Sequence, residues 1–274
     1  MAVTMADITH LRKMTGAGMM DCKNALTESD GDFDKAVEII RKKGQAIAAK
    51  RSDRDASEGY VLAKVDGKYA AILALKCETD FVAKNADFIA LTTQILDLAI
   101  ANKSADIEAV KALSLGKGTV ADAVTDRSGI TGEKMELDGY SFVEGETTAV
   151  YIHPGNKLAT IVALNQAGVD TQIAREVAMQ VAAMNPIAVD QASVPADILA
   201  REKEIAADKA RQEGKPENMI ARIAEGRISK FYKEACLLEQ EYVKDEKLTI
   251  AQFLNNHSKG LTVTAFKRFT LNAE

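Results

Sequence analysis

The stretch of sequence that decides the fold is KYAAILAL, Lys68 to Leu75, because a similar stretch, KLATIVAL, recurs at Lys157 to Leu164. A lysine, two alanines, an isoleucine and the final leucine hold the same places in both. Each is an apolar run of strand length. The recurrence predicts an internal duplication of the central part of the chain, with one such strand in each copy.

Each of these two stretches follows another strand-like run, so each predicts a β-hairpin. Tyr60 to Val65 precedes the first stretch across Asp66-Gly67, a dipeptide typical of two-residue hairpin loops. Thr147 to His153 precedes the second across Pro154-Gly155-Asn156, a turn sequence. The same order of strand, turn and strand in both places supports the duplication.

A helical pattern follows each hairpin, from about Asn85 to Ile100 and from about Asp170 to Met184. Shorter helices are expected up to about Ser128, and Thr249 to Leu254 and Leu261 to Phe269 predict a closing helix and strand. We therefore expect two related antiparallel sheets, each covered on one face by helices, in an α+β fold.

The first fifty residues predict three short helices. Thr4 and Asp7 have the spacing of a capping box before the first helix, and glycines at 16 and 18 mark a turn before the second. The apolar positions of the second and third helices recur at helical spacing. A module of this size buries a small core, which favours a docking domain, and the polar stretch Arg51 to Glu58 predicts a linker after it.

The segment Pro195 to Lys233 has no strand pattern and is rich in alanine and charged residues, with a break at Gly214-Lys215-Pro216. Two helices joined by a tight break pack antiparallel, so we expect an inserted antiparallel helical hairpin. An ordinary pair of helices within a globular core is the alternative. The thin apolar stripe favours a projecting arm.

These patterns predict four parts of the chain. They are a three-helix docking domain at 1–52, a first core subdomain at 58–138, a second core subdomain at 139–185 and 234–271, and a helical hairpin arm at 190–233.

The composition is that of a soluble globular protein, with 47% hydrophobic and 27% charged residues and a formal net charge of −5. A mildly acidic chain is a poor candidate for binding nucleic acid through its phosphates. No apolar run is long enough to span a membrane, and no signal peptide is visible. The scattered Cys22, Cys77 and Cys236 predict no disulfide framework and favour a reducing, cytoplasmic location.

We find no sequence signature of an enzyme. The chain has no phosphate-binding loop, no dinucleotide fingerprint and no nucleophile elbow, and its cysteines and histidines lack metal-ligand spacing. We therefore expect no catalytic residues, no metal and no cofactor. An active site assembled from distant residues is the least favoured alternative.

The segment Gly16 to Lys23 combines apolar and polar residues in a way that suits a contact surface. On a helix Met20 and Lys23 share a face beside the one that carries Met19 and Cys22. A flexible methionine at a helix edge can adapt to a partner. The alternative is that Met20 covers the small core of the three helices.

The segment Thr79 to Val82 follows the inner strand of the first copy and contains Phe81, whereas the matching Gly168 to Thr171 has no aromatic residue. In one interpretation Asp80 or Asn85 caps the next helix and Phe81 packs on the core. In the other, Phe81 stands out on a loop and enters a pocket of a partner, as interface anchors do.

Several segments resemble bacterial translation elongation factor Ts. The N-terminal signature is Leu11-Arg12 followed by TGAGMMDCK at Thr15 to Lys23, and the second is TDFVAK at Thr79 to Lys84. Gly214 to Glu217 resembles the family's coiled-coil arm, and Phe266 to Phe269 its closing segment. The matches occur in order and cover nearly the whole chain.

The resemblance implies a ubiquitin-associated-like N-terminal domain, a coiled-coil arm and a guanine-nucleotide exchange factor for the GTPase elongation factor Tu. It also implies that Thr79, Asp80, Phe81 and Val82 displace the partner's Mg²⁺, that Arg12, Met19, Met20 and Lys23 bind the partner, and that His153 is a further contact. Such a factor needs no direct binding of nucleotide, nucleic acid or membrane. A protein-binding module without exchange activity is the alternative from another class.

Overall fold

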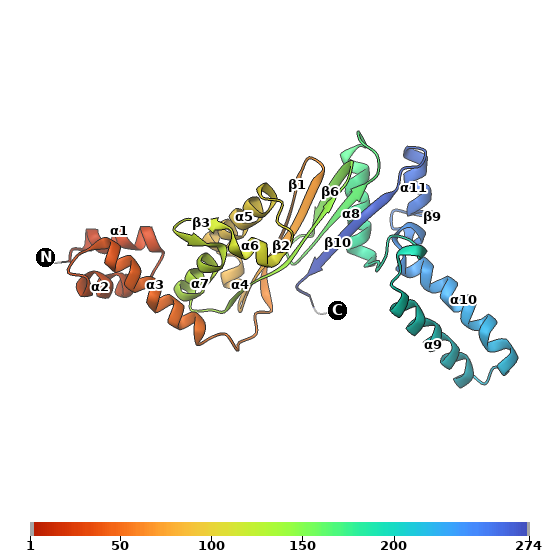
Figure 1. Ribbon diagram of the computed structural model, residues 1–274, viewed down its shortest axis with the longest axis horizontal. Coiled ribbons are helices and arrows are strands. Elements are labelled where there is room, and N and C mark those ends of the chain that lie inside the picture. The colour runs from red at the N-terminus through yellow and green to blue at the C-terminus, as the bar shows by residue number, and fades with distance from the viewer. Residues whose placement is uncertain (1–2, 273–274) are drawn as a thin grey trace. The chain divides into compact units, whose positions relative to one another are not determined.

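The computed structural model describes residues 3–272, and it mixes helices with antiparallel sheets, which confirms the predicted α+β class (Figure 1). The chain forms two compact units. The first contains the residues up to Leu62 together with Leu73–Tyr140, and the second contains Ala63–Ile72 and Ser141–Asn272. The turn end of the first hairpin therefore belongs to the second unit.

The three N-terminal helices are α1 (Met5–Thr15), α2 (Met19–Glu28) and α3 (Phe33–Ala49). The predicted capping box is present, with Thr4 accepting from the Asp7 backbone and Asp7 accepting from Thr4 in return. Their shared core is small, as expected. It consists of Ile8, Leu11, Ala17, Cys22, Ala25, Leu26 and Ala36.

Helix α3 continues through Gly44, and that glycine lies against α7 (Val120–Thr131). A Cβ atom built on Gly129 of α7 would stand 2.1 Å from the Cα atom of Gly44. Ion pairs from Arg41 to Asp122 and Asp126 flank this contact. Two facing glycines thus allow the two helix backbones to pack directly on each other.

The first sheet has the strand order β1-β2-β5, formed by Glu58–Asp66, Tyr69–Cys77 and Met135–Glu144. The sequence does not predict β5. Its residues are mostly half-exposed rather than strictly alternating, and Asp138-Gly139, with Gly139 at φ 64°, has the character of a turn. Strand β2, which contains KYAAILAL without its lysine, lies in the middle of the sheet and is almost completely buried.

Four helices separate β2 from β5. They are α4 (Asp80–Ala83), α5 (Ala86–Ala101), α6 (Ile107–Ala112) and α7, with the short strand pair β3 (Ser114–Leu115) and β4 (Gly118–Thr119) before α7. Helix α5 matches the predicted long helix and buries Phe88, Thr92, Ile95, Leu96, Ala99 and Ile100.

The second sheet has the order β10-β7-β6, formed by Val263–Thr270, Leu158–Leu164 and Thr147–Ile152. Both pairings are antiparallel, with Thr147 and Val263 facing Leu164 on its two sides. Strand β7, which contains KLATIVAL without its lysine, lies in the middle and is buried throughout. The two similar stretches thus occupy the middle of two three-stranded sheets.

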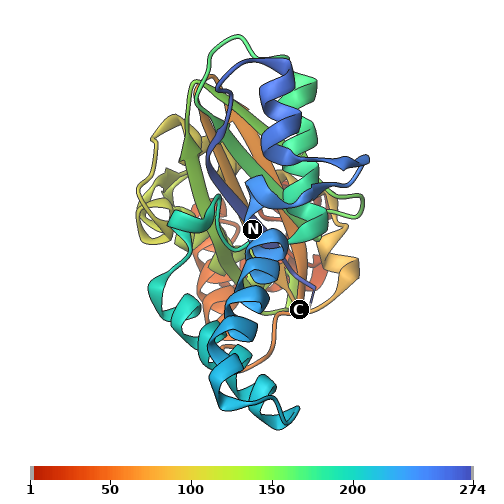
Figure 2. The ribbon, with the colours of Figure 1, turned by 90° about the vertical axis from the view of Figure 1, so that its right-hand side faces the viewer.

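Helices α8 (Thr171–Met184) and α11 (Ile250–His257) share one core with the second sheet, and Figure 2 shows them side by side. The core includes Val162, Leu164, Ala174, Val177, Ala178, Val181, Ile250, Phe253 and Leu254. The strand pair β8 (Glu241–Tyr242) and β9 (Asp245–Thr249) precedes α11. The 3₁₀ turns are η1 (Gln191–Ser193) and η2 (Leu237–Glu239).

Helices α9 (Ala196–Gln212) and α10 (Glu217–Ala235) form a packed pair joined by a short turn. Arg227 of α10 donates to both carboxylate oxygens of Glu213 at 2.7 Å and to the carbonyl oxygen of Ala206 at 3.1 Å. One guanidinium of α10 therefore binds α9 both within the helix and at its C-terminal end.

Cys22, Cys77 and Cys236 are buried free thiols. Among the helices of residues 3–272, none combines the length and the apolar character that a membrane span requires.

Glu176 of α8 is expected to make the second unit sensitive to acid. Burial acts to raise the pKa of Glu176, but hydrogen bonds from Lys244, Tyr242 and Gln172 outweigh it and lower this pKa to about 2. A carboxylate whose pKa is lower in the folded state stabilises the fold above the unfolded-state pKa, and this contribution is lost as the pH falls from about 4 to about 2. With its side chain 17% exposed, we expect Glu176 to contribute about 2 kcal/mol at neutral pH.

The measurement is chemical unfolding of the wild-type chain and Glu176→Gln at pH 7 and at pH 2.5. The variant should be less stable at pH 7, and the difference should shrink at the lower pH. A difference that is the same at both pH values would show that the ionised carboxylate has no such role.

Candidate functional site

Phe81 is the most exposed large apolar side chain among the residues that the structure describes, at 84% of its full exposure. It lies on α4, a single helical turn between β2 and α5. The interpretation in which Phe81 packs on the core is therefore wrong. The ring stands out from the surface as the other interpretation expects, though on a helical turn rather than a loop, and its entry into a pocket of a partner stays a prediction. Exposure of a whole phenyl ring to water is unfavourable, so we expect the Phe81 ring to become buried in a complex.

Thr79 starts this turn as its N-cap. Its side-chain oxygen accepts from the backbone N–H of Val82 at 3.4 Å, and its carbonyl oxygen accepts from the N–H of Ala83 at 3.2 Å. Asn85 caps the next helix, as one interpretation of the sequence proposed, by accepting from the N–H of Asp87 at 3.0 Å. Two successive caps thus determine the path of the chain on both sides of Phe81.

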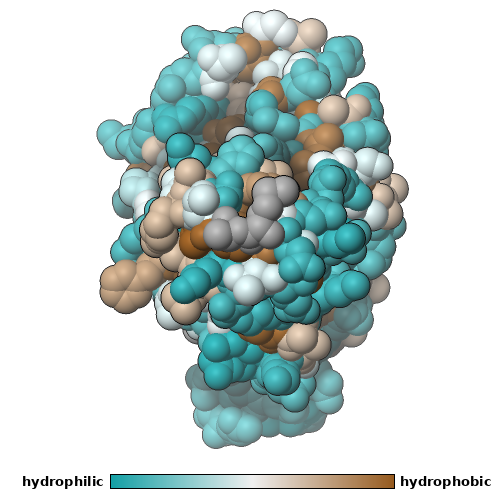
Figure 3. All heavy atoms as spheres, turned by 90° about the vertical axis from the view of Figure 1, so that its left-hand side faces the viewer, coloured by the Kyte–Doolittle hydropathy of each residue, from teal (hydrophilic) through white to brown (hydrophobic). Residues whose placement is uncertain are grey.

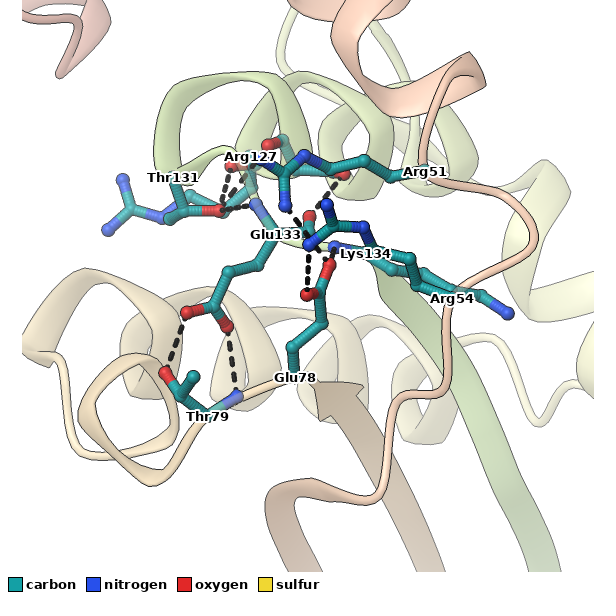
Figure 4. Close-up of polar contacts among 9 residues, drawn as sticks. Arg51, Arg54, Glu78, Thr79, Arg127, Thr131, Glu133 and Lys134 are labelled. Carbon is teal, nitrogen blue, oxygen red and sulfur yellow. Dashed lines mark hydrogen bonds and ion pairs between the residues drawn. The ribbon is translucent and has the colours of Figure 1, made fainter.

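A glutamate from a distant segment holds Thr79. Glu133, which follows the end of α7, accepts from the backbone N–H of Thr79 at 3.0 Å and from its hydroxyl at 2.6 Å (Figure 4). The thiol of Cys77 donates to the Thr79 carbonyl at 3.2 Å. Burial raises the pKa of Cys77 to about 12, and the Glu133 carboxylate adds to this effect, so the thiol stays neutral and able to donate.

Glu78 makes the reciprocal contact. Its carboxylate accepts from the backbone N–H of Lys134 at 2.6 Å, and it also binds Arg51 at 3.4 Å and Arg54 at 3.0 Å (Figure 4). The backbone hydrogen bond from Lys134 is the largest cause of the lowered pKa of Glu78. We call the Glu78–Lys134 and Thr79–Glu133 contacts together the carboxylate clamp. It joins the end of β2 to the start of β5.

Asp80 and Val82 flank Phe81 on α4. The Asp80 carboxylate accepts from Lys84 at 2.6 Å, and this hydrogen bond raises the pKa of Lys84. The side chains of Asp80 and Lys84 both reach the surface, at 47% and 76% exposure. The turn therefore presents an aromatic ring beside an ion pair that water can reach.

The N-terminal site residues lie around the turn between α1 and α2. Met19 and Met20 are 40% and 65% exposed, so the alternative in which Met20 covers the small core is wrong. Arg12 and Lys23 are exposed as well. The face seen in Figure 3 carries apolar side chains scattered among hydrophilic ones. Flexible thioethers between basic groups are suited to an adaptable contact with a protein.

His153 follows β6 in the second unit, whereas the other predicted site residues lie in the first. Its exposed ring hydrogen-bonds through Nδ1 to the hydroxyl of Tyr151 at 3.0 Å. The guanidinium of Arg175 lies over the Tyr151 ring, 5.7 Å from its centre. The three side chains form a polar and aromatic group at one end of β6.

Sequence reasoning missed Glu133, Glu78 and the arginines that bind it, because single carboxylates in connecting segments are typical of solvated surface. Their partners are distant in sequence, so no local spacing signals the contacts. The one usable signal is Gly132, a helix C-cap at φ 70°, which fixes the chain direction just before Glu133.

Comparisons with known proteins agree with one another. The family model described as Elongation factor TS matches residues 78–273. Among curated proteins, the chain is 60% identical over 275 residues to "Elongation factor Ts" of Porphyromonas gingivalis, with both chains fully covered. It is 54% identical over 274 residues to the protein of that name from Azobacteroides pseudotrichonymphae and 53% identical over 331 residues to that of Phocaeicola vulgatus, again with full coverage of both chains.

Proposed function

The chain belongs to the elongation factor Ts family, and we propose that it releases GDP from elongation factor Tu by displacing the Mg²⁺ ion that helps to hold the nucleotide. Membership of the family implies nucleotide exchange on elongation factor Tu during translation elongation. The displacement of Mg²⁺ and the roles of individual residues are our proposal. A cytoplasmic location accords with this role in translation.

The exposure of Phe81 on an anchored turn is the observation that carries the proposal. GDP in a GTPase is held by phosphate contacts and by Mg²⁺, which bridges the phosphates to the protein. Insertion of the Phe81 ring beside the groups that hold the ion would shift them. Thr79 and Val82 would hold the shape of the turn through their capping hydrogen bond, and the carboxylate of Asp80 would act electrostatically near the ion.

The energy for this distortion comes from the burial of Phe81. Transfer of a phenylalanine side chain from water to an apolar pocket is favourable by about 2 kcal/mol. In the free chain the ring remains in water, so this stabilisation becomes available only in the complex. The proposed factor therefore stabilises the nucleotide-free GTPase and makes or breaks no covalent bond.

Docking is proposed to involve the exposed residues of the N-terminal helices, namely Arg12, Met19, Met20 and Lys23, and in the second unit His153. Binding of this chain and of nucleotide to the GTPase are thermodynamically linked. If this chain weakens GDP binding by some factor, GDP weakens the binding of this chain by the same factor. Rebinding of nucleotide therefore releases the exchange factor.

Release of a fluorescent GDP analogue from purified elongation factor Tu tests the proposed function. The wild-type chain should accelerate release in a saturable way, and excess unlabelled GDP should only prevent rebinding. Unchanged release in the presence of a stable complex would leave a protein-binding module without exchange activity as the correct interpretation.

A further inference from the structure

We propose that Glu133 is a positioning residue for nucleotide exchange, which holds Phe81 in the orientation that enters the GTPase. The inference rests on the proposed function and concerns a side chain that is half-buried. Glu133 lies on the segment between α7 and β5, distant in sequence from the turn that it holds.

The turn that carries Phe81 cannot hold its own shape. Helix α4 has four residues, and a helix of that length is not stable without tertiary contacts. Phe81 is 84% exposed, so packing of its ring does not fix the turn. Ala83 is the buried residue of the turn, so the orientation of the ring depends on the packing of this small side chain and on the residues at the base of the turn.

Glu133 supplies two of these basal contacts. Its two carboxylate oxygens accept separately from the N–H of Thr79 at 3.0 Å and from its hydroxyl at 2.6 Å. The hydroxyl that donates to Glu133 also accepts from the N–H of Val82. One carboxylate thus fixes the backbone at the start of α4 and the side chain that caps it.

Glu133 is itself held in place. Its carbonyl oxygen accepts from the hydroxyl of Ser128 at 2.5 Å, and its N–H donates to the hydroxyl of Thr131 at 3.3 Å. The neighbouring Lys134 N–H binds Glu78, the residue before Thr79 (Figure 4). Two adjacent residues on each segment are bonded across, so loss of Glu133 would remove the contact nearest to Phe81 and leave those of Glu78 and of the Cys77 thiol at the base of the turn.

The test measures GDP release from elongation factor Tu over a range of concentrations of wild type, Glu133→Ala, Glu133→Gln and Phe81→Ala. The maximal rate reports insertion, and the half-saturating concentration reports docking. We expect Glu133→Ala to lower the maximal rate about tenfold, because the Phe81 ring would no longer be held in the orientation that insertion requires. The half-saturating concentration should stay unchanged within about twofold. Glu133→Gln keeps the shape and one acceptor, so its loss should be smaller.

Glu136→Ala is the matched control, since Glu136 lies on the adjacent strand and pairs with Lys76 rather than with the turn. It should exchange at the wild-type rate. The double variant Glu133→Ala/Phe81→Ala separates positioning from a general effect. If Glu133 acts through Phe81, the alanine at 133 should have no further effect once the ring is absent.

An unchanged maximal rate for Glu133→Ala, beside a clear loss for Phe81→Ala, would overturn the inference and leave the proposed function intact. An equal loss with and without the Phe81 ring would also overturn it. Failure of the wild type to accelerate release would instead refute the proposed function on which the inference depends. Thermal melts of all variants accompany the assay, and Glu133→Gln decides the outcome if the alanine variant does not fold.

Discussion

Phe81→Ala is expected to lower the maximal rate at which the chain releases GDP from elongation factor Tu by about tenfold or more. The ring is exposed in the free chain, so its burial stabilises only the complex in which the nucleotide site is distorted. Loss of about 2 kcal/mol from that state corresponds to more than a tenfold loss of rate. Stopped-flow release of fluorescent GDP at saturating factor measures it.

The stability of Phe81→Ala is the internal control. Substitution of an exposed side chain changes the free energy of unfolding by about 0.5 kcal/mol or less, so the melting temperature should stay near that of the wild type. A fall of about 3 kcal/mol, the size of a core phenylalanine truncation, would instead mean that the ring packs inside the protein. Wild-type exchange by this variant would contradict its proposed role.

Gly129→Ala is expected to destabilise the first unit by about 3 kcal/mol, the upper part of the range for overpacking, because the added methyl group meets backbone rather than a movable side chain. The Cβ atom would stand 2.1 Å from the Cα atom and 2.7 Å from the carbonyl oxygen of Gly44. Relief requires α3 and α7 to separate, which would also disturb Arg41 and its two aspartates. Chemical unfolding measures the loss.

Gly226→Ala is the matched control, because Gly226 lies within helix α10 and a Cβ atom there would meet nothing within 4 Å. The same change should stabilise the chain by about 0.5–1 kcal/mol, through the better helix propensity of alanine. Opposite signs for the two substitutions would support the direct packing of α3 on α7. Similar small effects would show that these helices are not in backbone contact.

Local sequence pattern was sufficient to predict several features of the fold. The KYAAILAL and KLATIVAL stretches predicted the two central strands, because continuous apolar runs of that length suit the middle of a covered sheet. The spacing of Thr4 and Asp7 predicted the capping box. The second copy has no aromatic residue at the place that matches Phe81, and this difference correctly indicated an exposed ring.

The features that local pattern did not predict depend on contacts between distant segments. Strand β5 has too irregular a pattern to be recognised without its neighbour β2. The contact between Gly44 of α3 and Gly129 of α7 has no local signal, because the two glycines lie on helices that are distant in sequence. Glu133 lies in no recognisable motif, because the group that it binds, the backbone N–H of Thr79, is distant in sequence.

The most direct test of the central claim is the rate of GDP release from elongation factor Tu at saturating factor, measured with Mg²⁺ present and after its removal by a chelator. If the chain acts by displacing the ion, prior removal of the ion by the chelator already produces part of the same effect. The acceleration of GDP release by the chain should then be smaller without Mg²⁺, by about tenfold or more, and the loss of rate in Phe81→Ala should be smaller as well. The same acceleration with and without Mg²⁺ would contradict the account.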